Sequence, residues 1–275
     1  MYVAAAVNDD GPALTRERRV LALTAAAAAS LRTDYWFSHE TAALLHGLAV
    51  YRLSEQVHVI QTWKPKVRRD RDPYLRRHPV TLPERDRTAI GALPVTTLER
   101  TLVDCARWLP EVRALVVADS AFRAGARRDV VHKILAEAAG RPGVRQARRV
   151  VELADERAES PGESIVRWYV LEAGLDPPEL AVAVDTWRGT YWLDLAWRGP
   201  KVGIEFDGAV KYSGREYGDP QERLLDEKRR HDALVEAGWT ILRVTWADLR
   251  DPDRLVMRVR RAIERSAMVR RDSAR

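Results

Sequence analysis

The stretch YWLDLAWRGPKVGIEFDG, residues 191–208, contains two apolar segments joined by a Gly-Pro turn, and each carries a carboxylate near its end. Apolar segments joined by such a short turn predict an antiparallel hairpin of two strands. In this hairpin Asp194 can lie beside Glu205, and the period of two places Glu205 and Asp207 on one face. Carboxylates on an apolar strand are costly to bury unless they are paired or bind a metal ion.

Converging carboxylates form a set of hard oxygen donors that suits Mg²⁺ or Mn²⁺. We therefore interpret Asp194 and Glu205 as candidate metal ligands, because such an ion can activate water and neutralise charge on a phosphate. Alone, Asp207-Gly208 is a common turn pair, and Asp194 alone is readily explained by pairing with an arginine. Either motif by itself favours a structural role, whereas the two together favour a site.

The segments around this hairpin predict a mixed α/β module. Helices are expected at 163–173, 219–237 and 252–268, and strands at 181–186, 191–196, 201–206 and 239–244. The order is therefore helix, three strands, helix, strand, helix. Ser160-Pro161-Gly162 precedes this set and predicts a boundary between two domains, 1–159 and 160–275. We expect an α/β (α+β) protein of two domains.

The chain from Glu163 onward resembles the PD-(D/E)XK nuclease superfamily and, within it, the small very-short-patch-repair-like (Vsr-like) branch. The resemblance rests on Glu163, Asp194, the run Ile204–Gly208, the charged helix with Asp226, Lys228, Arg230 and Asp232, and the run Gly238–Arg243. It implies a restriction-endonuclease-like α-β-β-β-α-β-α core and a metal-dependent nuclease with Mg²⁺ or Mn²⁺ as its cofactor.

The resemblance also implies roles for individual residues. Asp194 and Glu205 correspond to the two acids that hold the metal ion in the superfamily. Glu163 supports the metal through water, while Arg230 and Arg243 contact phosphate or brace the carboxylates.

The chain departs from the superfamily at one catalytic position. A lysine usually follows the second acid by two residues and positions the attacking water, but this chain has Asp207 there. Lys211 lies four residues further on and is the candidate replacement. Either the site cleaves with Asp207 and Lys211 in altered roles, or the nuclease fold binds nucleic acid without cutting it.

The N-terminal half predicts helices at 14–31, 38–48, 98–109, 111–122, 129–139 and 143–157, and strands at 57–60, 80–82 and 93–95. The runs SHETAALLHGL, residues 38–48, and LPVTTLERTLVD, residues 93–104, resemble the AbiEi-type antitoxin domain. This resemblance implies a module that binds DNA or a partner, as in abortive-infection toxin–antitoxin systems.

Several residues of this half have structural interpretations. Ser38 can cap the helix that follows it, and Thr96 and Glu99 form a predicted capping box. Cys105 lies on the apolar face of the next helix and is interpreted as a core residue. His39 and His46 are seven residues apart on one helix. Because a zinc site needs more ligands nearby, we interpret both histidines as surface or packing residues.

Residues 64–87 form a basic arm in which Trp63 and Tyr74 interleave with arginines and lysines. We expect a loop or hairpin, and Lys64, Lys66, Arg68 and Arg69 are its candidate nucleic-acid-binding residues. The alternative is a solvated hairpin with local ion pairs.

The composition fits a polyanionic partner. The net charge is +6 with a sequence pI of about 9.6, and the basic surplus lies in residues 1–159. This favours nucleic acid, although an inert basic surface explains the charge equally well. No apolar run reaches the roughly 18 residues of a membrane span. The single cysteine excludes an internal disulfide, so we expect a cytoplasmic protein with no membrane partner.

The sequence thus predicts a metal-dependent nuclease that acts on phosphodiester bonds, in DNA by preference, within DNA repair or phage defence. The alternative is a non-catalytic DNA-binding antitoxin or transcriptional regulator with a degenerate nuclease fold. A third possibility is a module that neutralises a cognate toxin. A homodimer is a further possible assembly.

Overall fold

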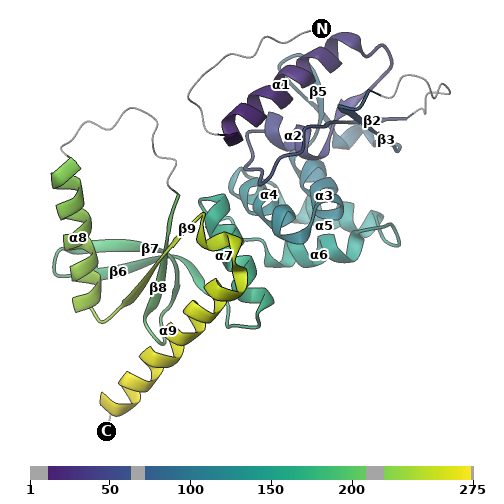
Figure 1. The fold of residues 1–275 in the computed structure, drawn as a ribbon. Helices are drawn as coiled ribbons and strands as arrows, with labels where there is room; N and C mark the ends of the chain where they lie inside the picture. The colour runs from purple at the N-terminus through teal and green to yellow at the C-terminus, as the bar shows by residue number, and fades with distance from the viewer. Residues whose placement is uncertain (1–11, 63–71, 209–219, 274–275) are drawn as a thin grey trace. The chain divides into compact units, whose positions relative to one another are not determined.

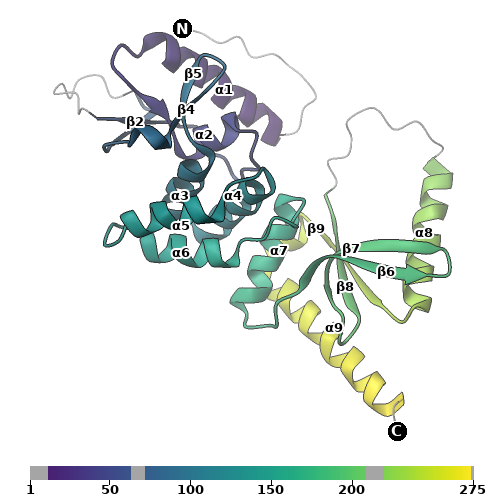
Figure 2. The same ribbon diagram turned by 180° about the vertical axis from the view of Figure 1, so that it is seen from behind.

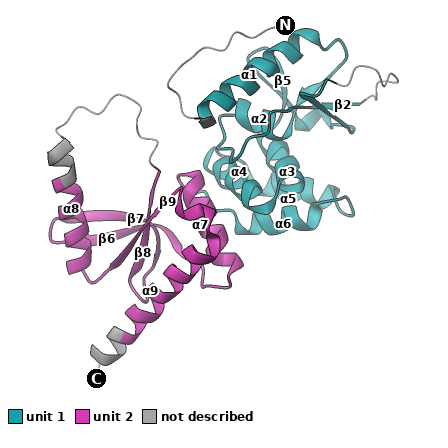
Figure 3. Ribbon diagram, viewed as in Figure 1, with its two compact units in different colours: residues 1–156 teal, residues 157–275 magenta. Residues whose placement is uncertain are grey.

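The computed structural model describes residues 12–62, 72–208 and 220–273 of the chain. The chain divides into two compact units, residues 1–156 (unit 1) and residues 157–275 (unit 2), as Figure 3 shows. This division falls just before the boundary that the Ser160-Pro161-Gly162 break predicts. Both units combine helices with a mixed sheet, which confirms the expected α+β class (Figure 1).

Unit 1 contains a sheet followed by a group of helices. Its elements are α1 (Pro12–Ser30), β1 (Trp36–Phe37), α2 (His39–Leu45), β2 (Val57–Gln61), β3 (Leu75–Pro79), η1 (Glu84–Asp86), β4 (Arg87–Ile90), β5 (Leu93–Thr96), α3 (Leu98–Trp108), α4 (Glu111–Arg123), α5 (Arg128–Glu137) and α6 (Val144–Leu153). The sheet order is β3-β2-β1-β5-β4. Helices α1 and α2 pack against β2, while α3 to α6 pack on one another (Figure 2).

The core of unit 1 lies between the sheet and its first two helices. Phe37, Val57, Val59 and Val95 are fully or almost fully buried there. Cys105 is also fully buried, which confirms its interpretation as a core residue, and burial raises the pKa of its thiol well above the usual value. The cysteine is therefore held as a neutral thiol inside the packed helices.

The predicted capping box is wrong by one residue. Helix α3 begins after Thr97, whose hydroxyl accepts a hydrogen bond from the Arg100 N–H. Thr96 is instead the last residue of β5 and pairs with Arg87 on β4. Glu99 accepts a hydrogen bond from the Arg127 N–H rather than reaching back to the cap. Thr96, which the local pattern assigns to the helix cap, therefore belongs to strand β5.

The predictions for the basic arm also need correction. The expected strand at 80–82 is absent, and β3 lies earlier, at residues 75–79. Strands β2 and β3 are parallel, with Val57 opposite Leu75, so these two strands are not the two arms of a hairpin. The candidate nucleic-acid-binding residues Lys64, Lys66, Arg68 and Arg69 lie outside the described residues.

Unit 2 follows the predicted order of elements. They are α7 (Pro161–Glu172), β6 (Glu179–Thr186), β7 (Gly189–Trp197), β8 (Val202–Asp207), α8 (Pro220–Glu236), β9 (Thr240–Thr245), η2 (Asp248–Arg250) and α9 (Pro252–Ser273). The sheet order is β6-β7-β8-β9, with the first three strands antiparallel and β9 parallel to β8. Figure 1 shows α8 on one face of this sheet and α7 with α9 on the other.

The apolar alternation of the strands builds the core of unit 2. Val182 and Val184 of β6 and Leu193 of β7 pack with Leu234 of α8 and Trp239. Burying side chains of this size stabilises a fold by about 1.5–3 kcal/mol each, so this layer fixes α8 on the sheet. Among the helices of the described chain, none is both long and apolar enough to cross a membrane.

Candidate functional site

The hairpin of β7 and β8 brings Asp194 and Glu205 together. The strands are antiparallel, with Leu195 opposite Ile204, so the same register places Asp194 opposite Glu205. Beyond this pair the Asp194 side chain replaces the backbone as hydrogen-bond acceptor, because its Oδ2 accepts a hydrogen bond of 2.6 Å from the Phe206 N–H. The two predicted ligands are thus neighbours on adjacent strands.

Strand β6 is distorted at the same level. The pairs Leu180–Leu195 and Val182–Leu193 place Ala181 opposite Asp194, but the ladder has no pair at that step. Ala181 has a φ of 49°, in the left-handed region that residues with a side chain rarely adopt. Strained backbone of this kind tends to occur at functional sites, where the surrounding structure holds it in place.

Glu205 has a buried carboxylate oxygen without a hydrogen bond from the described chain. Its side chain is only 14% exposed, and its Oε1 has no hydrogen-bond partner in the part of the chain that the structure describes. Burial raises the pKa of Glu205, against the opposing effects of Arg230 and Arg243, and the Asp194 charge raises this pKa further. A buried carboxylate oxygen without a hydrogen bond is a position that a cation can satisfy.

Arg230 of α8 is the cation next to this oxygen. Its Nη2 lies 2.9 Å from Glu205 Oε1, an ion pair that lacks hydrogen-bond geometry, and donates a 2.8 Å hydrogen bond to the Trp192 carbonyl. Arg243 lies opposite Glu205 on β9 and pairs with Glu227 at 2.8 Å. Both arginines that the resemblance singles out therefore border the carboxylates.

Glu163 has a structural role that the sequence signals only in part. Its N–H donates to the Ser160 hydroxyl, and its Oε2 accepts a 2.8 Å hydrogen bond from the Glu159 N–H. This arrangement caps α7. Burial raises the pKa of Glu163, hydrogen bonding of its carboxylate with the Ser160 side chain and the Glu159 N–H opposes this effect, and the charge of Asp194 raises the pKa further. Glu163 therefore lies within electrostatic reach of Asp194 while it closes the start of the helix.

Gly162 and Phe206 are in contact beside the carboxylates, which sequence reasoning did not predict. A Cβ atom on Gly162 would lie 2.0 Å from Phe206 Cε1, so only a residue without a side chain fits there. Phe206 also packs edge-on against Trp246, with ring centroids 5.1 Å apart. The glycine at the start of α7, directly after Pro161, was the available signal, although its partner could not be read from the sequence.

The two other predicted catalytic residues, Asp207 and Lys211, are not shown in contact with the carboxylate pair. Asp207 is exposed at the end of β8, opposite Thr245 on β9. Lys211 lies outside the described residues. The catalytic roles of Asp207 and Lys211 therefore stay predictions.

The donor set of this site fits a hard divalent cation. Asp194 and Glu205 supply carboxylate oxygens on adjacent strands, and the Glu205 Oε1 has no hydrogen bond from the described chain. Glu163 does not join them in a compact cluster of three. Within the described segments, the one group of three or more potential ligands within 4.8 Å is formed by histidines of unit 1.

Comparison with known proteins finds relatives in Mycobacterium tuberculosis. The chain is 36% identical over 171 residues to two uncharacterized proteins, MT2308 of strain CDC 1551 / Oshkosh and Rv2248 of strain ATCC 25618 / H37Rv. The match covers 61% of this chain and 61% of each relative, so the chain spans less than two thirds of their length. No family model and no solved structure matches the chain.

Proposed function

We propose that unit 2 is a metal-dependent nuclease that hydrolyses phosphodiester bonds, in DNA by preference. The observation that carries this proposal is the carboxylate pair. Asp194 is held by the Phe206 N–H opposite Glu205, whose buried Oε1 has no hydrogen-bond partner within the described chain. Two neighbouring carboxylates, one of them buried with only an arginine ion pair at its Oε1, are costly to keep, and such groups are common at functional sites.

The residues around the pair have complementary tasks in this proposal. Asp194 and Glu205 would hold Mg²⁺ or Mn²⁺, which when bound supplies a Lewis acid and lowers the pKa of water. The Phe206 N–H keeps the Asp194 carboxylate in one orientation. Arg230 and Arg243 bring positive charge to the same place, where they can attract a phosphate group. The biological setting we propose is DNA repair or defence against phage DNA.

Cleavage assays test this proposal directly. Supercoiled plasmid, single-stranded DNA and RNA are incubated with the full chain and Mg²⁺, Mn²⁺ or EDTA. Asp194→Asn and Glu205→Gln remove one charge each, and Asp226→Asn is the matched control. Asp226 lies on α8 with a side chain that is 69% exposed.

We expect metal-dependent cleavage that both site variants lose and the control keeps. Absence of cleavage by the well-folded wild type on every substrate would overturn the nuclease proposal. Equal cleavage by Asp194→Asn and wild type would show that a contaminating nuclease, and not this site, cuts the substrate.

A specific contact favours a second candidate function. Arg230 already neutralises Glu205 at 2.9 Å, and position 207 carries an aspartate instead of the lysine of the superfamily. Both features suit a degenerate nuclease fold that serves as a DNA-binding antitoxin or regulator. This function predicts DNA binding that weakens steeply with salt, without cleavage. A module that only neutralises a toxin neither binds nor cleaves DNA.

A further inference from the structure

Three of the six histidines of the chain meet in unit 1, although they are distributed over three elements. His39 is the first residue of α2, His58 lies in β2 and His78 in β3. In the parallel pairing of β2 and β3, His78 lies opposite Ile60. Since Ile60 and His58 are two residues apart, the pleat turns His58 and His78 to the same face of the sheet.

The start of helix α2 is joined to this face by hydrogen bonds to both backbone groups of His58. The Ser38 N–H donates to the His58 carbonyl at 3.0 Å, and the His58 N–H donates to the Thr41 hydroxyl at 2.8 Å. His39 has a φ of 51°, in the left-handed region. The chain therefore holds an unfavourable backbone conformation at the residue that carries the third imidazole.

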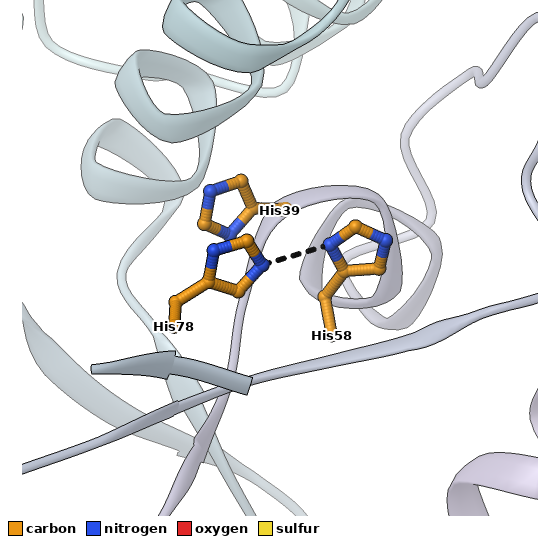
Figure 4. Close-up of side chains that lie close together, drawn as sticks. All are labelled: His39, His58 and His78. Carbon is orange, nitrogen blue, oxygen red and sulfur yellow. Dashed lines mark hydrogen bonds between the residues drawn. The ribbon is translucent and has the colours of Figure 1, made fainter. Parts of the chain in front are cut away.

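The three rings lie in contact, as Figure 4 shows. His39 and His78 are stacked with centroids 3.8 Å apart, and His58 lies 5.2 Å from His78. One ring nitrogen of each histidine lies within 4.8 Å of the others. His39 and His58 are buried, and His78 is half-buried. The cluster is thus a compact set of nitrogen donors that largely excludes water.

We propose that His39, His58 and His78 form a binding site for a transition-metal ion of the zinc class, which links α2 to β2 and β3. His58 Nδ1 and His78 Nε2 are 3.0 Å apart and share a hydrogen bond. Two nitrogens bound to one tetrahedral zinc at about 2.0–2.1 Å are separated by about 3.3 Å. A shared metal ion can therefore replace the shared proton with little movement of these two rings.

Polar groups already lie against the outward sides of two rings. The Ser38 hydroxyl lies 3.0 Å from His39 Nδ1, and the Ser54 hydroxyl lies 3.5 Å from His58 Nε2. The Glu40 carboxylate lies 4.0 Å from the same His58 nitrogen. Histidines that bind metals usually direct their second nitrogen to a carboxylate, carbonyl or water, which fixes the tautomer and orients the ring.

Glu40 is itself firmly held, so it can provide the negative charge beside the site. Its side chain is 2% exposed, and its Oε1 accepts hydrogen bonds from Arg113 and from the Ser54 N–H. Its other oxygen, Oε2, is the one that faces His58. The carboxylate therefore bridges a fixed arginine and the histidine cluster.

The donor chemistry distinguishes this site from the carboxylate pair of unit 2. Neutral imidazole nitrogens favour zinc, copper, nickel and cobalt ions, whereas Mg²⁺ prefers oxygen ligands. Burial first, and then nearby positive charge, lowers the pKa of His58 to about 3 and that of His78 to about 4. The rings are therefore neutral at neutral pH, which is the form that binds metal ions.

Metal stoichiometry tests the proposal. The full chain, expressed without a histidine tag, is freed of metal with a chelator, loaded with Zn²⁺ or Co²⁺, and separated from unbound ion. We expect one ion per chain in wild type and a loss of affinity of more than about 10-fold in His58→Gln and His78→Gln. His132→Gln, which changes an exposed histidine of α5, should keep the ion. Asp194→Asn should also keep it, whatever the outcome of the nuclease assay.

A measurement on the wild type covers the case in which a variant does not fold. Diethyl pyrocarbonate modifies accessible imidazoles, and mass spectrometry locates the modified residues. Zn²⁺ should protect His78 and leave His132 reactive. The proposal is overturned if the wild type retains no zinc, if His132→Gln loses zinc as fully as His58→Gln, or if zinc leaves His78 as reactive as before.

Discussion

The Asp194 Oδ2 atom accepts a 2.6 Å hydrogen bond from the N–H of Phe206, the residue that follows Glu205. A side chain of β7 therefore completes the pairing of β8 at the step where the backbone ladder ends after Leu195 and Ile204. One carboxylate oxygen of Asp194 maintains the hairpin, and the charge of the group faces Glu205. The structural and chemical roles of this residue can be separated because asparagine preserves the acceptor and removes the charge.

For Asp194→Asn we predict a folded protein in which the proposed nuclease activity is lower by on the order of 100-fold or more, because a neutral amide binds Mg²⁺ poorly. Metal-dependent plasmid cleavage measures the loss, and thermal unfolding measures stability. Asp194→Ala should in addition lower the melting temperature, because the Phe206 N–H loses its acceptor. Equal melting temperatures for the two variants would contradict the structural half of this prediction.

Removal of the Arg230 guanidinium should destabilise unit 2. Breaking a buried ion pair costs about 3–5 kcal/mol, but the side chains of Arg230 and Glu205 are 32% and 14% exposed, so water reduces the effect to about 1–3 kcal/mol. Urea unfolding of Arg230→Met measures this change. Arg229→Met removes an exposed ion pair with Asp226 and should cost less than about 0.5 kcal/mol.

The same variant has a pH dependence with a definite sign. Burial already raises the pKa of Glu205, and loss of the Arg230 charge raises this pKa further. An acid whose folded pKa is raised destabilises the protein where it is ionised, so the penalty is present at neutral pH and shrinks as acid protonates Glu205. A destabilisation that grows towards acidic pH would show that Glu205 is not the group left unpaired.

Gly162→Ala should disturb the site without touching a charged residue. The new Cβ would lie 2.0 Å from the Phe206 ring, and relief of this overlap must move the ring or the start of α7. Overpacking of this kind costs about 1–3 kcal/mol, and we expect weaker cleavage because Phe206 also holds Asp194. Gly199→Ala is the control, since no atom lies within 4 Å of its added Cβ.

The histidine cluster predicts acid sensitivity of unit 1 in the presence of a chelator. The pKa of His58 is lowered to about 3 and that of His78 to about 4, mainly by burial, from an ordinary value of 6.5. The unfolded chain therefore takes up protons first, and stability falls as the pH drops below 6.5 towards 4 by up to about 1.4 kcal/mol per histidine and unit of pH.

Hydrogen exchange of the β2 amides follows this local stability. His78→Gln should flatten the pH profile, whereas His132→Gln should reproduce that of the wild type. A wild-type profile that is flat below pH 6.5 would mean that the cluster is protonated as easily in the folded state as in the unfolded chain.

Local pattern was sufficient for most elements of unit 2. The alternation in β7 and β8 predicts two strands, and the short Gly199-Pro200 turn between them predicts their antiparallel pairing, which the structure shows. A hairpin is a local structure, so the neighbourhood of Asp194 and Glu205 follows from residues close together in the chain. The contact of Gly162 with Phe206 does not, because it depends on how α7 packs on the sheet.

In unit 1, some strand boundaries and side-chain contacts could not be predicted from the local sequence. The sequence placed Thr96 at a helix cap, but pairing with Arg87 makes it the end of β5. It also left His39 and His46 without further ligands, because the partners His58 and His78 reach His39 only through the parallel pairing of β2 with β3. The sequence determined the helices of both units and the strands of unit 2, since periodicity and turn residues act over a few positions, but in unit 1 it missed β1, β3 and β4. Only the tertiary structure decided which strands pair and which side chains meet, since those choices depend on the burial of surfaces supplied by distant segments.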